Sequence, residues 1–161
     1  MRKIVWIVVF AMAASIMSLA LVTSSGAIEQ EKTLTFVYEP INETGIDIDG
    51  DQNLTPGDGW ITNVALLKNG EVVGKAISAC QYAQVRRDGM GGALQCLISA
   101  KVPGGQITAQ QRFVLIEGKT SGLPSAAITG GTGEYANVRG YISAEPIEGS
   151  MKAKITLHLL P

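Results

Sequence analysis

Residues 151–159 read MKAKITLHL, and this stretch decides the fold class of the chain. Every second residue is apolar, while lysine, threonine and histidine occupy the positions between them. Because successive side chains of a strand point to opposite faces, this alternation predicts a strand that separates an apolar interior from water.

Similar strand signals recur upstream of this stretch, and no long helical periodicity interrupts them. They cover residues 33–38, 60–67, 71–85, 94–102, 106–116, 125–129 and 135–144. Asn69-Gly70 is a type I′ hairpin signal, and Pro103-Gly104-Gly105 marks another tight turn. About eight sequential strands can close without leaving free edges, so the sequence predicts an all-β, eight-stranded antiparallel closed barrel.

Composition bounds the class of protein further. A chain of 161 residues is the usual size of one domain. The formal net charge is −1, and the chain has no lysine or arginine run that follows a phosphate backbone, so a nucleic-acid partner is not expected.

The first 27 residues are typical of an export signal. Arg2 and Lys3 precede a nearly continuous apolar run over residues 4–22, and Ser25-Gly26-Ala27 supplies the small residues of a cleavage site. We expect cleavage after Ala27 and a barrel domain over residues 28–161. The alternative is an uncleaved membrane anchor. In both cases the domain is extracytoplasmic, that is secreted, periplasmic or at the cell surface.

Export changes the interpretation of the two cysteines. In an oxidising compartment a cysteine pair favours a disulfide, and Cys80 and Cys96 lack the paired spacing of a zinc site. Arg87-Asp88-Gly89 lies midway between them and supplies turn residues, so the cysteines can face one another across a hairpin. We predict this disulfide, with two buried free thiols as the alternative.

A polar loop over residues 42–59 carries a dense set of oxygen ligands. The candidates for a hard cation such as calcium are Asp47, Asp49, Asp51, Asn53 and Asp58. Glycine falls at the fourth position of this loop rather than the sixth, and no helices flank it, so an EF-hand is not expected. The alternatives are a solvated acidic loop, and a role for Asp58 at the barrel rim.

Residues 128–141 read ITGGTGEYANVRGY, a pattern in which consecutive glycines allow a sharp corner before a strand. This segment resembles the glycine corner and arginine-glycine pair of the dirigent and allene oxide cyclase family. Pro56-Gly57-Asp58, Val73-Gly74, residues 92–96 and residues 103–108 follow in the family's order, so the likeness runs from Thr33 to the C-terminus. It is nearest to small secreted bacterial members.

The resemblance implies a calycin-like barrel with a mostly apolar lumen that is open at one end and assembles as a dimer or trimer. In plant relatives such a lumen holds a reactive intermediate and directs its cyclisation or coupling without a metal or organic cofactor. The chemistry implied is that of an isomerase acting largely through shape control.

The resemblance also nominates Arg139, which strand alternation places on the same face as Tyr141 and opposite Gly140. If that face is the lumen, the guanidinium stabilises an anionic intermediate. The alternative is an arginine that braces carbonyls at the glycine corner. Tyr82 and Arg112 are further catalytic candidates, with a solvated barrel exterior as their alternative.

His158 is the only histidine, and Lys152 and Lys154 share its face. This pattern predicts an exposed histidine, and the chain has no Gly-x-Ser-x-Gly elbow, so triad hydrolase chemistry is not expected.

Two functions follow from these observations. The first is a cofactor-independent barrel that binds a small hydrophobic molecule and directs its cyclisation or coupling. The second is a non-catalytic extracellular barrel that binds a hydrophobic ligand or another protein. Convergent ionisable groups in the lumen would favour catalysis, and a filled or wholly apolar lumen would favour a structural role.

Overall fold

The computed structural model describes residues 31–120 and 125–160, and the predicted leader (residues 1–27) lies outside them. All regular secondary structure in the described ranges is β-strand. The strands are β1 (Lys32–Ile46), β2 (Gly59–Lys68), β3 (Glu71–Val85), β4 (Gly91–Val102), β5 (Gly105–Ile116), β6 (Lys119–Thr120), β7 (Ser125–Gly133), β8 (Arg139–Pro146) and β9 (Ala153–Leu160). Among these residues no helix is long and apolar enough to cross a membrane.

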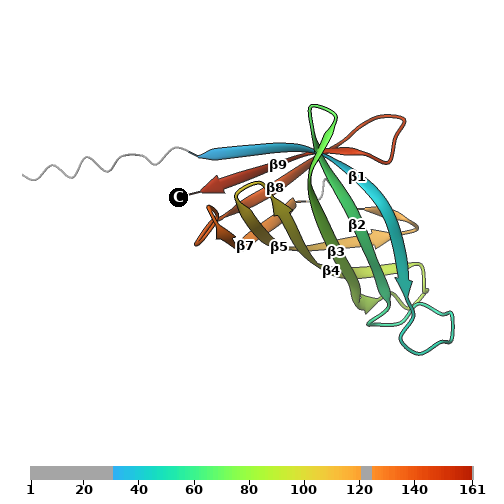
Figure 1. Ribbon diagram of the computed structural model, residues 1–161. Coiled ribbons are helices and arrows are strands. Elements are labelled where there is room, and N and C mark those ends of the chain that lie inside the picture. Colours follow the sequence, from blue (N-terminus) through green and yellow to red (C-terminus); the bar gives the residue numbers. More distant parts are fainter. Residues whose placement is uncertain (1–30, 121–124, 161) are drawn as a thin grey trace, which may run out of the picture.

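The strands form one antiparallel sheet that closes on itself (Figure 1). Its order is β4-β3-β2-β1-β9-β8-β7-β5-β6, and pairing of β4 with β5 completes the ring. The short β6 pairs only with the end of β5, outside the eight-stranded ring. The predicted eight-stranded closed barrel is thus confirmed, with one extra strand.

Several strand boundaries differ from the sequence prediction, and two of the differences reflect irregular backbone. Residues 134–138, expected to begin a strand at Tyr135, form a turn instead, because Gly133 and Asn137 adopt positive φ. At the other boundary, β1 extends to Ile46 through a β-bulge between Pro40 and Asn42, where a polar loop was expected.

One end of the barrel is plugged by packed side chains. Its core contains Leu66, Ile107 and Leu157, each exposed by 2% or less. Tyr135, from the turn after β7, packs into the same cluster and donates its hydroxyl to the Pro103 carbonyl at 2.7 Å. The glycine-corner motif therefore closes this end of the barrel.

Gly140 shows why the arginine-glycine pair of the motif requires glycine at its second position. It has φ +139, and a Cβ there would lie 1.8 Å from the His158 carbonyl oxygen. No side chain fits at that distance, so β8 approaches β9 closely only with glycine at this position.

The predicted disulfide is confirmed. Cys80 on β3 and Cys96 on β4 are direct cross-strand partners, with their Cα atoms 4.0 Å apart. The bridge packs with Tyr82 and Leu94 in a second buried cluster, nearer the opposite end from Tyr135.

The disulfide makes a first testable prediction. The double variant Cys80→Ala/Cys96→Ala should lower the free energy of unfolding by about 3 kcal/mol, because the bridge closes a short loop in the unfolded chain. Urea titration followed by circular dichroism measures this loss, and dithiothreitol should shift wild type in the same direction. Arg86 and Arg87 lie between the cysteines, so a tryptic digest should yield two peptides joined by the bridge. Equal midpoints for variant and wild type would contradict the prediction.

Candidate functional site

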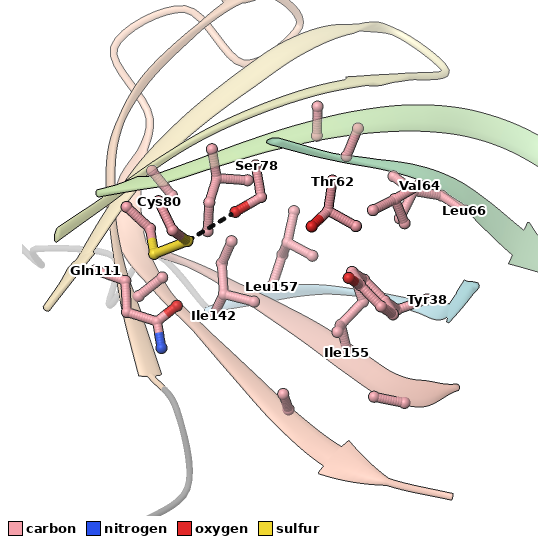
Figure 2. A pocket seen from close by; sticks show the side chains of 18 of the residues that line it. Tyr38, Thr62, Val64, Leu66, Ser78, Cys80, Gln111, Ile142, Ile155 and Leu157 are labelled. Atoms are coloured by element: carbon pink, nitrogen blue, oxygen red, sulfur yellow. Dashed lines mark hydrogen bonds between the residues drawn. A yellow bond between two sulfur atoms is a disulfide. The ribbon is translucent and has the colours of Figure 1, made fainter. Parts of the chain in front are cut away.

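The barrel encloses a cavity of about 360 Å³ between the plugged end and the opposite end. Strand alternation builds its wall, since every second residue of each strand points inward. On β2, for example, the inward residues are Trp60, Thr62, Val64 and Leu66. Figure 2 shows Val64 and Leu66, with Ile142, Ile155 and Leu157, around an open interior. The lumen is therefore mostly apolar and not filled by the protein's own side chains.

A polar group interrupts this apolar wall where β1 meets β2. Glu43 and Thr62 are direct cross-strand partners, and the buried Thr62 hydroxyl donates to Glu43 Oε2 at 3.1 Å. Tyr38 lines the same cavity. Burial raises the pKa of the Tyr38 phenol, and the nearby Glu43 carboxylate raises it further, because both disfavour a second negative charge. Two ionisable groups thus line the lumen, of which Glu43 is also exposed to solvent.

Glu43 was not among the residues predicted from the sequence, and the β-bulge explains why. Tyr38 and Glu43 lie an odd number of residues apart, so uninterrupted alternation would place them on opposite faces. The bulge between Pro40 and Asn42 adds one residue to β1 and turns Glu43 inward. Proline in a strand was the available signal, because it is confined to edges and bulges.

Further polar groups continue this wall onto β3 and β5, where Ser78 is the direct cross-strand partner of Thr62. The Cys80–Cys96 disulfide lines the cavity, and Ser78 Oγ lies 3.6 Å from Cys80 Sγ. The Gln111 amide also lines this side, as Figure 2 shows. These groups supply hydrogen-bonding capacity without charge.

The loop after β1 holds Asp58 at the rim of the open end. Asp58 is 5% exposed, and its carboxylate accepts hydrogen bonds from the Ile48 N–H at 3.0 Å and the Thr55 N–H at 2.8 Å. These two hydrogen bonds hold the pKa of Asp58 below its usual value, and the bond from the Thr55 N–H has the larger effect. Asp58 therefore fixes the conformation of this loop.

The structure brings together three of the five predicted metal ligands. Carboxylate oxygens of Asp47, Asp49 and Asp58 lie within 4.8 Å of one another. Asp51 and Asn53 instead bond each other, with Asn53 N–H donating to Asp51 Oδ1 at 2.7 Å. Acidic groups of this kind occur without a metal, and Asp58 already has its own donors, so calcium binding stays a prediction.

The face of β8 that carries Arg139 is the barrel exterior. Arg139 is exposed and Tyr141 is 42% exposed, whereas Ile142 and Ala144 line the lumen. Arg112 on β5 is also exposed. Arg139 and Tyr141 therefore do not face the lumen, which was the condition for their proposed role. A catalytic role for these exterior residues stays a prediction.

Tyr82 differs from the other three candidates because it is buried. It is 7% exposed and packs edge-on against Trp60, with ring centroids 6.1 Å apart. The two rings help to line a smaller hollow beneath the acidic loop. Tyr82 thus supports the open end of the barrel.

His158 lies on the exterior beside Tyr141, and it is half-covered rather than freely exposed. The two rings stack with centroids 4.2 Å apart. His158 Nε2 shares a hydrogen bond of 3.1 Å with Ser143 Oγ, and Nδ1 pairs with Glu31 Oε1 at 2.5 Å. This network joins the start of the described chain to β8 and β9.

The fold and the cavity define a closed β-barrel with a lumen of ligand size. Three of the solved structures that are similar to it illustrate the likeness. One named pyocyanin demethylase is 27% identical, with a TM-score of 0.63, over 80% of this chain and 99% of that chain. The Diels-Alderase AbmU from Streptomyces koyangensis is 13% identical, with a TM-score of 0.56, over 84% and 72% of the two chains. AbnU, an exo-specific intermolecular Diels-Alderase, is 12% identical, with a TM-score of 0.53, over 81% and 98%.

No family model matches the chain, and no curated protein matches its sequence. The structural neighbours are therefore β-barrel enzymes that share the fold, and membership of the dirigent and allene oxide cyclase family stays a prediction.

Replacement of Arg139 by alanine tests the exterior candidate. Because Arg139 is exposed, we expect the melting temperature and binding of an apolar probe such as 1-adamantanol to remain unchanged. Circular dichroism melts and calorimetry measure the two quantities. Lost binding with an unchanged melt would place Arg139 in the site, and a lowered melting temperature would show that it braces the glycine corner.

Asp58→Asn tests the bracing of the acidic loop. The amide nitrogen cannot accept the hydrogen bond from the Thr55 N–H, so the variant should melt at a lower temperature than wild type at neutral pH. Since the folded-state pKa is lowered, this stabilisation is complete above the unfolded value of about 3.9 and disappears as pH falls through the folded value. The difference in melting temperature should therefore shrink in acid. The exposed Glu148→Gln is the control, and equal melts for Asp58→Asn and wild type at neutral pH would contradict the assignment.

Proposed function

We propose that this barrel binds a small hydrophobic molecule in its lumen and directs its cyclisation or coupling. The observation that carries the proposal is the unfilled apolar cavity of about 360 Å³ with a polar centre of Glu43, Thr62 and Tyr38 on one wall. Ligand sites typically have volumes of about 300–1,000 Å³ and combine apolar walls with a few placed polar groups.

The geometry suits control by shape. Side chains from all eight strands of the ring, together with Thr120 of β6, form a fixed wall, because each strand of the ring is hydrogen-bonded on both sides. A flexible reactant held in such a wall is restricted to few conformations, which lowers the entropy lost on reaching a cyclic transition state.

The polar centre supplies the chemistry that shape lacks. The Tyr38 phenol stays protonated near neutral pH, since its pKa is raised, and donates a hydrogen bond to a carbonyl or ether oxygen of the reactant. Glu43 accepts a proton or stabilises developing positive charge through the oxygen that Thr62 does not bind. A donor and an acceptor on one wall polarise a bound molecule without a cofactor.

Two further features of the proposal concern the setting of the protein. The Cys80–Cys96 disulfide agrees with an oxidising, extracytoplasmic compartment, which is where the predicted leader would deliver the barrel. The structural neighbours that carry enzyme names act on small molecules, which favours a catalytic barrel over a purely structural one.

Binding in the lumen is tested by filling it. Ala126 lines the cavity, and the next residue, Ala127, is exposed on the opposite face. Ala126→Phe should weaken binding of 1-adamantanol at least tenfold, whereas Ala127→Phe should not change it. Should Ala126→Phe fail to fold, Ala144→Phe, which also points into the lumen, replaces it. Undiminished binding by a folded lumen-filled variant would refute the proposed site.

Catalysis is tested in the source organism, because a cyclisation is an isomerisation that leaves the mass of the molecule unchanged. Replacing the chromosomal copy with Glu43→Gln or Tyr38→Phe should cause an isomer of the normal product to accumulate in culture extracts. Chromatography with mass spectrometry detects it, and Glu71→Gln on the plugged side serves as control. Identical profiles for wild type, Glu43→Gln and Ala126→Phe would favour the non-catalytic ligand-binding barrel.

A further inference from the structure

We propose that the lumen selects a positively charged apolar molecule, such as an organic ammonium or a heteroaromatic cation, and rejects anions. This inference rests on the proposed binding function and names the class of ligand. The juxtaposition that carries it is Glu43, the aromatic rings of Trp60 and Phe113, and an acidic loop at one opening of an otherwise apolar cavity.

The first argument is the charge of the wall. Glu43 is the only charged side chain among the described residues that line the cavity, and none of these residues is lysine, arginine or histidine. An anion that entered would lose its hydration without gaining a counter-ion, and it would meet the Glu43 carboxylate. A cation would lose the same hydration but gain that carboxylate as a partner.

Glu43 is placed to act as that partner. Only its Oε2 atom is engaged, by the Thr62 hydroxyl at 3.1 Å, and this bond holds the carboxylate against the β2 wall. The neighbouring Tyr38 carries no positive charge and therefore does not neutralise the Glu43 carboxylate. The carboxylate is therefore held in position at an exposed part of the cavity wall, and no basic side chain of the described residues pairs with it, which leaves it available to a cationic ligand.

The second argument is the aromatic lining near this opening. Trp60 precedes Thr62 by two residues on the inward face of β2, and Phe113 lines the cavity from β5. Cations bind favourably to the faces of such rings, most strongly to tryptophan. An apolar body with an ammonium or heteroaromatic head can thus contact ring faces and Glu43 together.

The third argument is the field outside the cavity. The loop that follows β1 carries Asp47, Asp49, Asp51 and Asp58 and contains no basic residue. It begins directly after Ile46, close to Glu43 along the strand, and Trp60 contributes both to the lumen and to the hollow beneath this loop. Figure 1 shows the loop (teal) projecting beyond the ends of β1 and β2. A loop of one charge sign raises the local concentration of cations. The turn after β3, at the same end of the barrel, carries Arg86, which pairs with Asp88, and Arg87.

Basic residues at the β8–β9 connection do not cancel this field. Lys152 pairs with Glu39 at 2.8 Å, and Lys154 pairs with Glu145 at 3.1 Å. Their charges are compensated locally, whereas the loop aspartates have no basic partner within their own loop.

Three molecules of nearly equal shape separate the effect of charge from that of size. They are 1-adamantylammonium, 1-adamantanol and adamantane-1-carboxylate. Trp60 is the only tryptophan outside the predicted leader, so its fluorescence reports binding in the lumen, and calorimetry gives the dissociation constants. We expect the ammonium to bind about three- to tenfold more tightly than the alcohol, and the carboxylate to bind more weakly than either.

Two further measurements locate the preference. Glu43→Gln should bring the affinity for the ammonium close to the affinity for the alcohol, and Glu71→Gln on the plugged side should leave all three affinities unchanged. Raising the ionic strength from about 0.01 M to about 1 M should weaken the binding of the ammonium but not of the alcohol, because it shortens the Debye length from about 30 Å to about 3 Å.

The outcomes distinguish this inference from the function on which it rests. If none of the three molecules binds, the proposed lumen function fails and the inference fails with it. If 1-adamantanol binds, and adamantane-1-carboxylate binds as tightly as 1-adamantylammonium, the lumen function stands and the charge selection is overturned. An ammonium preference that survives Glu43→Gln would overturn the role assigned to Glu43.

Discussion

Closure of the sheet is the constraint on which the rest of the structure depends. Pairing of β4 with β5 and of β1 with β9 leaves the eight strands of the ring without a free edge and with one common interior. Each strand then divides its residues between lumen and exterior, and one residue added to a strand exchanges the two faces. The cavity, its polar centre and the position of every candidate residue follow from this division.

The two ends of the barrel are built differently, and this difference gives the lumen a direction. At one end the glycine corner returns the chain so that Tyr135 can pack inward and donate to Pro103. At the other end Asp58 ties down a loop of aspartates, and the rim stays open over Trp60 and Glu43. Under the proposed function, a molecule with an apolar body and a polar head would bind with its body toward the plug and its head toward the Glu43 carboxylate.

The polar centre is made by an irregularity rather than by the regular barrel. Without the bulge after Pro40, the lumen would contain Tyr38 and Thr62 but no carboxylate, and it would be a neutral apolar container. Bulges commonly re-aim side chains beside functional sites. The disulfide, next to this centre on the neighbouring strands, holds β3 against β4, because Cys80 is the direct cross-strand partner of Trp60.

The sequence by itself determined the elements that depend on local chemistry. Alternation of apolar and polar residues over 151–159, the Asn69-Gly70 and Pro103-Gly104-Gly105 turns, and the cysteines on either side of Arg87-Asp88-Gly89 predicted strands, hairpins and the disulfide. Which face of β8 is the interior was decided only by tertiary structure: alternation separates Arg139 from Ile142, but closure of the sheet turns Ile142 inward. Glu43 escaped prediction for the same reason, because a bulge that reverses the faces depends on pairing with strands far away in the chain.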